Sequence, residues 1–198
     1  MSGMRGVARL AAAVLLAAGL LALAYVAFVQ VDTRAYQAFE RARLAHTTAR
    51  APAAPAAIEG TAIGEIHITR LGLAAVIVQG DSSDILQRAV GHLVETALPG
   101  EAGNVVLAAH RDTFFRPLKG IRIGDVIAVT TPEGDFEYVV IATAVVSPDA
   151  VEVLRPTPQR TLTLVTCFPF SYLGAAPNRF VVRARELNGG NRPDRRRL

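Results

Sequence analysis

The stretch Val126-Ile-Ala-Val-Thr-Thr-Pro-Glu-Gly-Asp-Phe-Glu-Tyr-Val-Val140 decides the class of fold. Its two ends, residues 126–130 and 136–140, are rich in β-branched and aromatic residues, and Pro132 and Gly134 stand between them. Two such runs joined by a short glycine-containing segment predict a β-hairpin. We expect residues 131–135 to form its loop.

The same alternation of short β-branched runs and turn signals extends through the region from Ile63 to Leu187. Helical signals in this region are confined to short pieces near Asp84–Ala89 and Phe114–Leu118. Seven or eight strands with little helix favour an all-β fold built as a closed or nearly closed barrel, although a β-sandwich has the same pattern. The strands expected are Ile63–Ile68, Ala75–Val78, Val105–His110, Val126–Thr130, Phe136–Val146, Thr161–Cys167 and Arg179–Leu187.

The N-terminal segment Leu10–Val29 contains no charged residue. Such a run crosses the roughly 30 Å hydrocarbon core of a bilayer as a helix, so we expect a transmembrane helix over residues 10–31. Arg5 and Arg9 precede it and favour a cytoplasmic position for residues 1–9, although three arginines soon after the run weaken this argument. A signal peptide cleaved near Ala22-Leu-Ala24 is the alternative. Both interpretations place the remaining chain outside the cytoplasm.

Three segments follow the predicted membrane helix. Residues 32–57 have the composition of a linker, helical where Ala and Arg dominate and semi-rigid in the Pro-Ala stretch 51–57. Residues 58–187 are long enough for one domain with its own core. The tail 188–198 is basic, has no apolar residue before its last position, and is expected to be disordered.

The charge of the 198-residue chain is unevenly distributed. Its formal net charge is +4, from 21 basic and 17 acidic residues, and its sequence pI is about 9.8. Six arginines lie before residue 58 and four after residue 187, so the region between them holds 11 basic and 14 acidic residues. The folded part is therefore mildly acidic, which excludes nucleic acid as an expected partner.

Three polar residues lie at the ends of predicted strands. Cys167 is the only cysteine and ends an apolar run, His110 ends another, and Arg179 begins a third. An exported domain with one cysteine has no internal disulfide, so the thiol is either a buried small hydrophobe or a nucleophile. In a barrel, neighbouring strands can bring all three groups to one rim.

The motifs around these residues resemble those of the sortases, cysteine transpeptidases of bacterial surfaces. Thr163-Leu-Val-Thr-Cys167 matches the cysteine motif, Ala108-Ala-His-Arg-Asp-Thr113 the histidine motif, and Arg179 the arginine of the family. Gly91-His-Leu93 and Ala97-Leu-Pro-Gly-Glu-Ala-Gly-Asn104 are similar to the class D branch. The match covers about residues 63–187, and Ala109 departs from the glycine of many relatives.

This resemblance implies an eight-stranded sortase barrel, anchored in the bacterial cell membrane by a single helix, with the catalytic domain on the extracytoplasmic side. It also implies two partners, a surface protein with a sorting signal resembling Leu-Pro-x-Thr-Gly and an amine nucleophile. Two alternatives differ from it. A peptidoglycan-type cysteine transpeptidase would carry histidine and cysteine close together in sequence, unlike this chain. A non-catalytic, membrane-tethered barrel that binds peptides would leave the thiol without a role.

The residue types suit amide cleavage through a thioester. Ordinary cysteine and histidine side chains differ by about 2 pKa units, which favours the neutral pair by about 2.7 kcal/mol, and a neighbouring arginine favours the thiolate or an oxyanion. We therefore expect Cys167 to attack the substrate carbonyl, His110 to protonate the leaving amine, and Arg179 to hold the carbonyl or oxyanion. The residues expected to contact substrate are Thr166, Phe168 and Phe114.

Metal and cofactor chemistry is not expected. His67 and His92 have no zinc-like spacing to another ligand. The acidic residues of the domain show no loop pattern with calcium ligands at short regular spacing. The sequence therefore predicts neither a metal site nor a cofactor.

Overall fold

The computed structural model describes residues 2–47, 58–171 and 174–187. The chain forms two compact units, one up to Tyr36 and one from Gln37 onward. The predicted Pro-Ala spacer at 51–57 and the predicted disordered tail at 188–198 lie outside the described residues.

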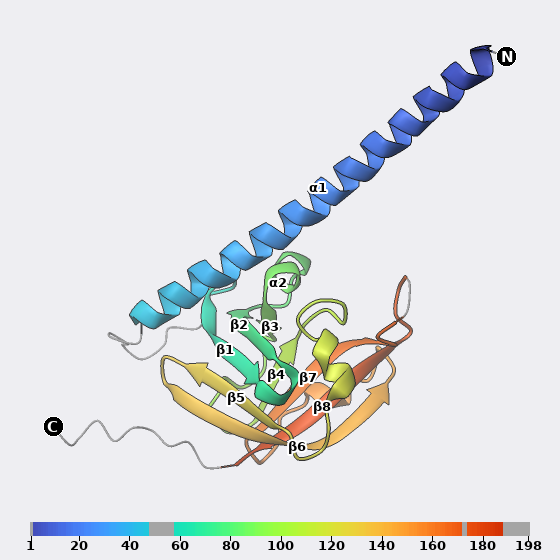
Figure 1. Ribbon diagram of the computed structural model, residues 1–198. Coiled ribbons are helices and arrows are strands. Elements are labelled where there is room, and N and C mark those ends of the chain that lie inside the picture. The colour runs from blue at the N-terminus through green and yellow to red at the C-terminus, as the bar shows by residue number, and fades with distance from the viewer. Residues whose placement is uncertain (1, 48–57, 172–173, 188–198) are drawn as a thin grey trace. The chain divides into compact units, whose positions relative to one another are not determined.

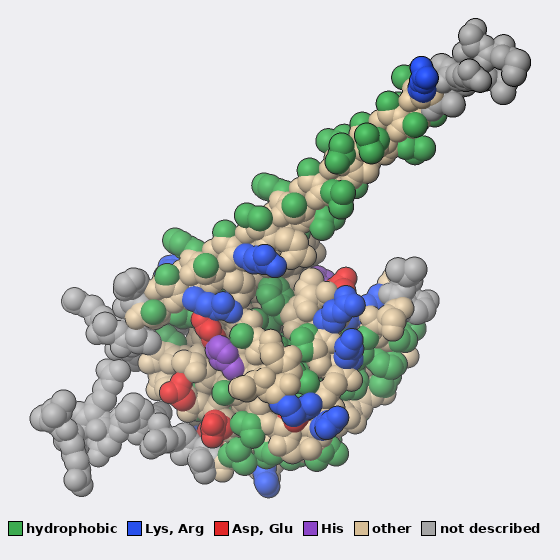
Figure 2. Space-filling model, in the orientation of Figure 1, with side chains coloured by type: hydrophobic (Ala, Val, Ile, Leu, Met, Phe, Trp, Pro, Cys, Tyr) green, Lys and Arg blue, Asp and Glu red, His purple; other side chains and the backbone are tan. Residues whose placement is uncertain are grey.

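The first unit is the N-terminal part of a single helix, α1 (Ser2–Thr47). Apolar side chains line it in Figure 2, and large ones such as Leu15, Leu21 and Phe28 are about 70% exposed, at 73%, 72% and 69%. An apolar helix of this length is a candidate for a membrane span. This helix is long and apolar enough to cross a membrane, as the sequence predicts.

The second unit is built around a closed barrel of eight strands (Figure 1). Closure confirms the barrel and excludes the sandwich. The strand order around the barrel is β1-β2-β3-β4-β7-β8-β6-β5, and β1 pairs with β5 to close it. The strands are β1 (Ala62–Ile68), β2 (Leu73–Gln79), β3 (Val90–His92), β4 (Asn104–Ala108), β5 (Val126–Thr131), β6 (Gly134–Val146), β7 (Thr161–Phe168) and β8 (Asn178–Glu186).

Four short helical pieces connect the strands. The helix α2 (Ser83–Arg88) lies close to the first predicted piece, and the 3-10 turn η2 (Arg116–Gly120) begins two residues later than the second. Two further 3-10 turns, η1 (Thr69–Leu71) and η3 (Val151–Leu154), have no helical signal in the sequence. A single 3-10 turn is too short to show a periodic pattern.

The predicted hairpin is present, with a tighter loop than expected. Thr131 pairs with Gly134, so only Pro132 and Glu133 connect β5 to β6. The Thr131 side chain closes this turn, because its hydroxyl donates to the Gly134 carbonyl at 3.2 Å and accepts from the Glu133 amide at 3.2 Å. These side-chain contacts stabilise a two-residue turn, which is shorter than the five-residue loop that the sequence predicts.

The strand that the sequence pattern misses is β3, which has only three residues. It runs parallel to β2 and antiparallel to β4, and so links the two. Gly91 allows β3 to lie close to the residue that follows β2, because a Cβ atom at position 91 would lie 2.5 Å from the Gly80 carbonyl oxygen. Three residues are too few for a period of two to be recognised.

The core fills the inside of the barrel. Alternate residues of each strand point inward, so Leu162 and Leu164 of β7 are fully buried while their neighbours face outward. Burial of each such side chain contributes about 1.5–3 kcal/mol. The largest apolar core residues are Tyr138, Phe115, Ile66, Ile68, Ile77, Leu107, Leu118, Ile127, Leu162 and Leu164.

The last turns of α1 belong to the same compact unit as the barrel. Gln37 is only 7% exposed, and both ends of its carboxamide are bonded. Its oxygen accepts from the Val76 amide at 2.9 Å, and its nitrogen donates to the Arg88 carbonyl at 2.7 Å. Arg41 adds an ion pair with Glu65 at 3.3 Å. The end of this helix is thus bonded to β1, to β2 and to the end of α2.

Candidate active site

Three neighbouring strands, β4, β7 and β8, lead to the candidate catalytic residues at one end of the barrel. In the antiparallel pair of β7 and β8, Cys167 is the direct partner of Arg179. In the parallel pair of β4 and β7, Ala108 lies opposite Val165. β4 ends at Ala108, two residues before the strand end that the sequence predicts at His110. The chain turns at His110, whose carbonyl accepts from the amides of Thr113 and Phe115. Adjacent strands lie about 4.8 Å apart, so Cys167 and Arg179 are neighbours across the sheet, and His110 follows the strand on the other side of β7.

Cys167 and Arg179 point to the outer face of the barrel. Leu162 and Leu164 face the core, so the alternation along β7 turns Cys167 outward. Along β8, Val182 and Ala184 face the core, which turns Arg179 outward as well. Cys167 is a free thiol and is partly exposed. The residue is thus partly accessible from the outer face.

Thr166 fixes the strand that leads to His110 against the strand that carries Cys167. Thr166 is 3% exposed, and its hydroxyl donates to the Ala109 carbonyl at 2.7 Å. The Ala109 amide in turn donates to the Val165 carbonyl at 3.3 Å. The hydroxyl thus serves a contact between strands, and its predicted contact with substrate stays a prediction.

The segment after β4 is also bonded to the connection between β7 and β8. Arg111, directly after His110, donates from Nη2 to the Gly174 carbonyl at 2.9 Å. On the other side of the site, Arg179 donates from Nη1 to the Asn178 carbonyl at 3.1 Å. Arg111 belongs to the histidine motif found in the sequence, but its bond to the Gly174 carbonyl has no local sequence signal.

Aromatic side chains cover the core at the level of the site. Phe168, Phe170 and Phe180 contact one another, with ring centroids 5.3–6.2 Å apart. Phe114, Phe170 and Phe180 also pack against the buried core. These contacts give Phe168 and Phe114 a packing role, and their contact with substrate stays a prediction.

The remaining histidines of the barrel contact side chains and carbonyls other than those of the candidate catalytic residues. His67 is half-buried and contacts Glu65 at 3.1 Å. His92 is fully buried, with Nδ1 2.8 Å from the Gln79 side-chain oxygen and Nε2 2.9 Å from the Ala97 carbonyl. Within residues 2–47, 58–171 and 174–187, no group of three or more His, Cys, Asp or Glu side chains is placed to hold a metal ion.

The burial of His92 predicts a loss of stability in mild acid. Burial lowers the pKa of His92 below 6.5, and its contact with the Ala97 carbonyl opposes this shift only in part. The unfolded chain therefore takes up a proton first as the pH falls below about 6.5, so stability is complete above that pH and declines below it. We expect the melting temperature to fall between about pH 7.5 and pH 5.5.

The variant His92→Gln tests the cause of this pH dependence. Its melting temperature at neutral pH should be lower than that of the unmodified chain, because the buried contacts of the ring are lost. Its pH dependence over the same range should be shallower, since the buried titratable group is gone. Equal slopes for the two proteins in thermal unfolding would assign the effect to another group.

Comparisons with known proteins agree with this architecture. The sequence matches the family described as Sortase domain over residues 66–187. Sortase D of Bacillus subtilis (strain 168) is 33% identical over 129 residues, which are 65% of this chain and 65% of that protein. The chain therefore spans just under two thirds of the length of this curated relative.

Solved structures of similar fold include two from other bacteria. A sortase D5 transpeptidase of Clostridium perfringens has a TM-score of 0.69 at 26% identity, over 78% of this chain and 99% of that chain. Sortase A from Corynebacterium diphtheriae has a TM-score of 0.61 at 30% identity, over 66% of this chain and 62% of that chain.

Proposed function

Because the chain belongs to the sortase family, we propose that it is a membrane-anchored cysteine transpeptidase that uses Cys167, His110 and Arg179 for acyl transfer. The observation that supports this proposal is the direct pairing of Cys167 with Arg179 on the outer face, beside the strand that leads to His110. A thiol, an imidazole and a guanidinium at adjacent strand ends are the groups that thioester chemistry needs.

The first half of the reaction forms the thioester. The thiolate of Cys167 attacks the carbonyl carbon of the scissile amide, and a C–S bond forms while the carbonyl oxygen becomes an oxyanion. The Arg179 guanidinium donates to this oxyanion, which has more negative charge than the ground-state carbonyl and so gains more from the contact. The C–N bond then breaks, and His110 gives its proton to the leaving amine.

The second half transfers the acyl group. An incoming amine attacks the thioester carbon, and His110 removes a proton from the attacking nitrogen. The second tetrahedral intermediate collapses with loss of the Cys167 thiolate, so a new amide replaces the thioester. The same histidine acts as acid and then as base, and the enzyme returns to its starting state.

The substrate proposed for this site is an extended peptide that resembles Leu-Pro-x-Thr-Gly, carried by a surface protein, with an amine nucleophile at the cell surface as acceptor. The single apolar helix α1 would anchor the enzyme in the cell membrane. Arg5 and Arg9 before it favour a cytoplasmic N-terminus. This orientation puts the barrel on the extracytoplasmic side, where surface proteins are available.

Product identification tests the proposal. The full chain, in detergent, is incubated with a library of sorting peptides and with candidate amines, and the products are identified by mass spectrometry. We expect a new amide between the acyl part of one peptide and an amine, and only hydrolysis or no product when the amine is omitted. A non-catalytic peptide-binding barrel would form no new amide with any combination.

A second arm of this experiment tests the orientation. The preferred peptide and amine, in forms that do not cross a bilayer, are added to intact cells with and without the chain. Conversion only in cells that carry the chain supports an extracytoplasmic site. Conversion that requires lysis of those cells would place the site on the other side of the membrane.

A further inference from the structure

Asn104 lies at the centre of a buried hydrogen-bond network on the outer face of the barrel. It belongs to β4 and is 2% exposed. Its amide nitrogen donates to the carbonyls of Val153 and Arg155, at 3.1 and 3.2 Å. Its oxygen accepts from the hydroxyls of Thr161 and Thr163, at 3.2 and 2.7 Å. The carboxamide therefore uses both donors and both acceptor positions.

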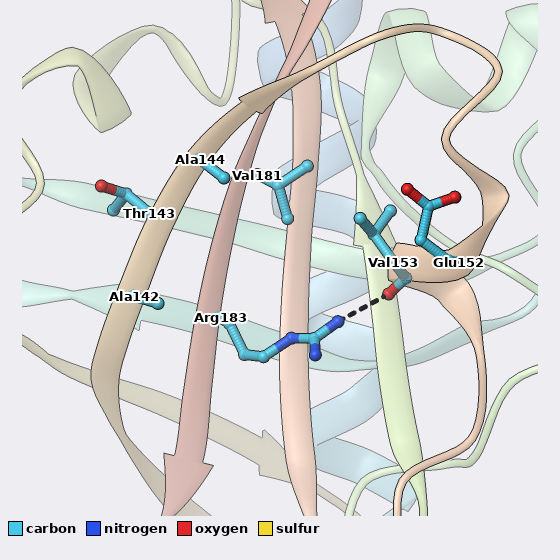
Figure 3. Close-up of a pocket in the computed structure, with 7 residues that line it drawn as sticks. All are labelled: Ala142, Thr143, Ala144, Glu152, Val153, Val181 and Arg183. Atoms are coloured by element: carbon cyan, nitrogen blue, oxygen red, sulfur yellow. Dashed lines mark hydrogen bonds between the residues drawn. The ribbon is translucent and has the colours of Figure 1, made fainter.

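Arg183 holds the same carbonyl from the opposite side. Its Nη2 atom donates to the Val153 carbonyl at 3.1 Å, as the dashed line in Figure 3 shows. Thr163 of β7 pairs with Val106 of β4 on one side and with Arg183 of β8 on the other. The Val153 carbonyl, bonded from β4 and from β8, therefore lies over β7 at the level of Thr163.

Packing alone does not hold η3 on the barrel. None of its four residues is fully buried, and Val151 is 62% exposed. On its β6 side, η3 borders an open pocket of about 290 Å³, lined by small residues such as Ala142 and Ala144 (Figure 3). With so little apolar area buried, the contacts from Asn104 and Arg183 supply much of what fixes the segment.

The position of η3 matters for a peptide bound at Cys167. Thr163 and Cys167 are four residues apart on the same face of β7, which corresponds to about 13 Å. Val165 lies between them on this face and is half-buried. An extended peptide of four residues also spans about 13 Å. A peptide that lies along β7 with its scissile bond at Cys167 therefore reaches η3.

We propose that Asn104 is a positioning residue that holds η3 across β7 as one wall of the peptide site, before substrate binds. This inference rests on the proposed function, because it concerns the substrate of that site. Because η3 is already fixed, peptide binding does not include the free-energy cost of ordering this segment. Loss of the Asn104 contacts should therefore weaken peptide binding and leave the reactivity of the thiol intact.

The variant Asn104→Asp separates the two halves of the network. A carboxylate still accepts from Thr161 and Thr163, but its second oxygen faces the carbonyls of Val153 and Arg155 and has no proton to donate. We expect KM for the sorting peptide to rise about 3- to 10-fold for each hydrogen bond lost, and kcat to change by less than about 2-fold. Alkylation of Cys167 by a small reagent should keep its rate.

Hydrogen exchange gives a readout that needs no substrate. The amides of Ala150, Val151, Val153 and Arg155 are bonded within the segment, and their exchange should accelerate about 10-fold in Asn104→Asp. The variant Arg183→Gln removes only the donor from β8, and we expect a smaller change in the same direction. Arg183→Gln is the variant to measure if Asn104→Asp does not fold. The matched control is Gln159→Glu, the same amide-to-acid change at an exposed residue of the same connection.

Each outcome decides a separate question. Faster exchange together with a higher KM supports the proposal. Exchange at the unmodified rate would overturn it whatever the activity, and faster exchange with an unchanged KM would overturn the role in peptide binding. If neither the variants nor the unmodified chain transfers peptide, the proposed function has failed. The role of Asn104 in peptide binding is then tested by comparing the peptide affinity of Asn104→Asp with that of Gln159→Glu.

Discussion

Replacing Cys167 with alanine is expected to lower kcat/KM for sorting-peptide cleavage by about four orders of magnitude or more. The reason is that the covalent route disappears, since no other thiol exists in the chain. Cys167 is only partly buried, so the fold should be retained. The measurement is the rate of peptide cleavage at enzyme concentrations high enough to detect slow turnover.

Peptide binding by this variant is the control. Cys167→Ala should bind the sorting peptide with an affinity close to that of the unmodified chain, and its melting temperature should change little. A residual cleavage rate within about tenfold of the unmodified rate would mean that the thiol is not the nucleophile.

Replacing Arg179 with glutamine is expected to lower kcat by about 100- to 1,000-fold, the loss typical when one oxyanion donor is removed. Glutamine retains a donor but loses the charge and the rigid fork of the guanidinium. Arg179→Lys should recover part of the rate, because it restores the charge without the fork. Steady-state kinetics with a single peptide and amine measure both variants.

Arg185→Gln is the matched control for this prediction. Arg185 lies on the same strand and the same face of it, but its partner on β7 is Thr161, six residues from Cys167. Its substitution should change kcat by less than about 2-fold. If Arg179→Gln and Arg185→Gln behave alike, a role of Arg179 in the transition state is wrong.

The sequence predicted the elements with long or regular patterns. The runs that became β5, β6 and β7 are rich in β-branched residues and are bounded by turn signals, so local chemistry was enough to find them. The resemblance to sortases is confirmed by the match over residues 66–187. Both depend on information that lies within short stretches of chain.

Long-range contacts were beyond the sequence pattern. The pairing of β1 with β5, which separates a barrel from a sandwich, joins strands about 60 residues apart. The parallel pairing of β4 with β7 brings the segment before His110 beside the strand of Cys167, and no local signal encodes its register. The strand-end positions of Cys167 and Arg179 were predictable, whereas β4 ends two residues before His110.

Buried polar contacts were missed for a related reason. Asn104 and Gln37 read as ordinary polar residues in sequence, and their meaning comes from partners about 40 to 60 positions away. A buried, hydrogen-bonded carboxamide determines how two segments are positioned against each other more than it adds to the apolar core. Both residues fix segments that carry no strong hydrophobic signal of their own.

The central claim is that Cys167 carries the acyl group between the two halves of the reaction. The direct measurement is intact-mass spectrometry of the full chain after rapid mixing with the sorting peptide in the absence of amine, followed by peptide mapping. The account predicts a mass increase equal to the acyl part of the peptide, located on Cys167 and removed when amine is added. Peptide cleavage with no such adduct, or with an adduct on another residue that amine removes, would contradict it.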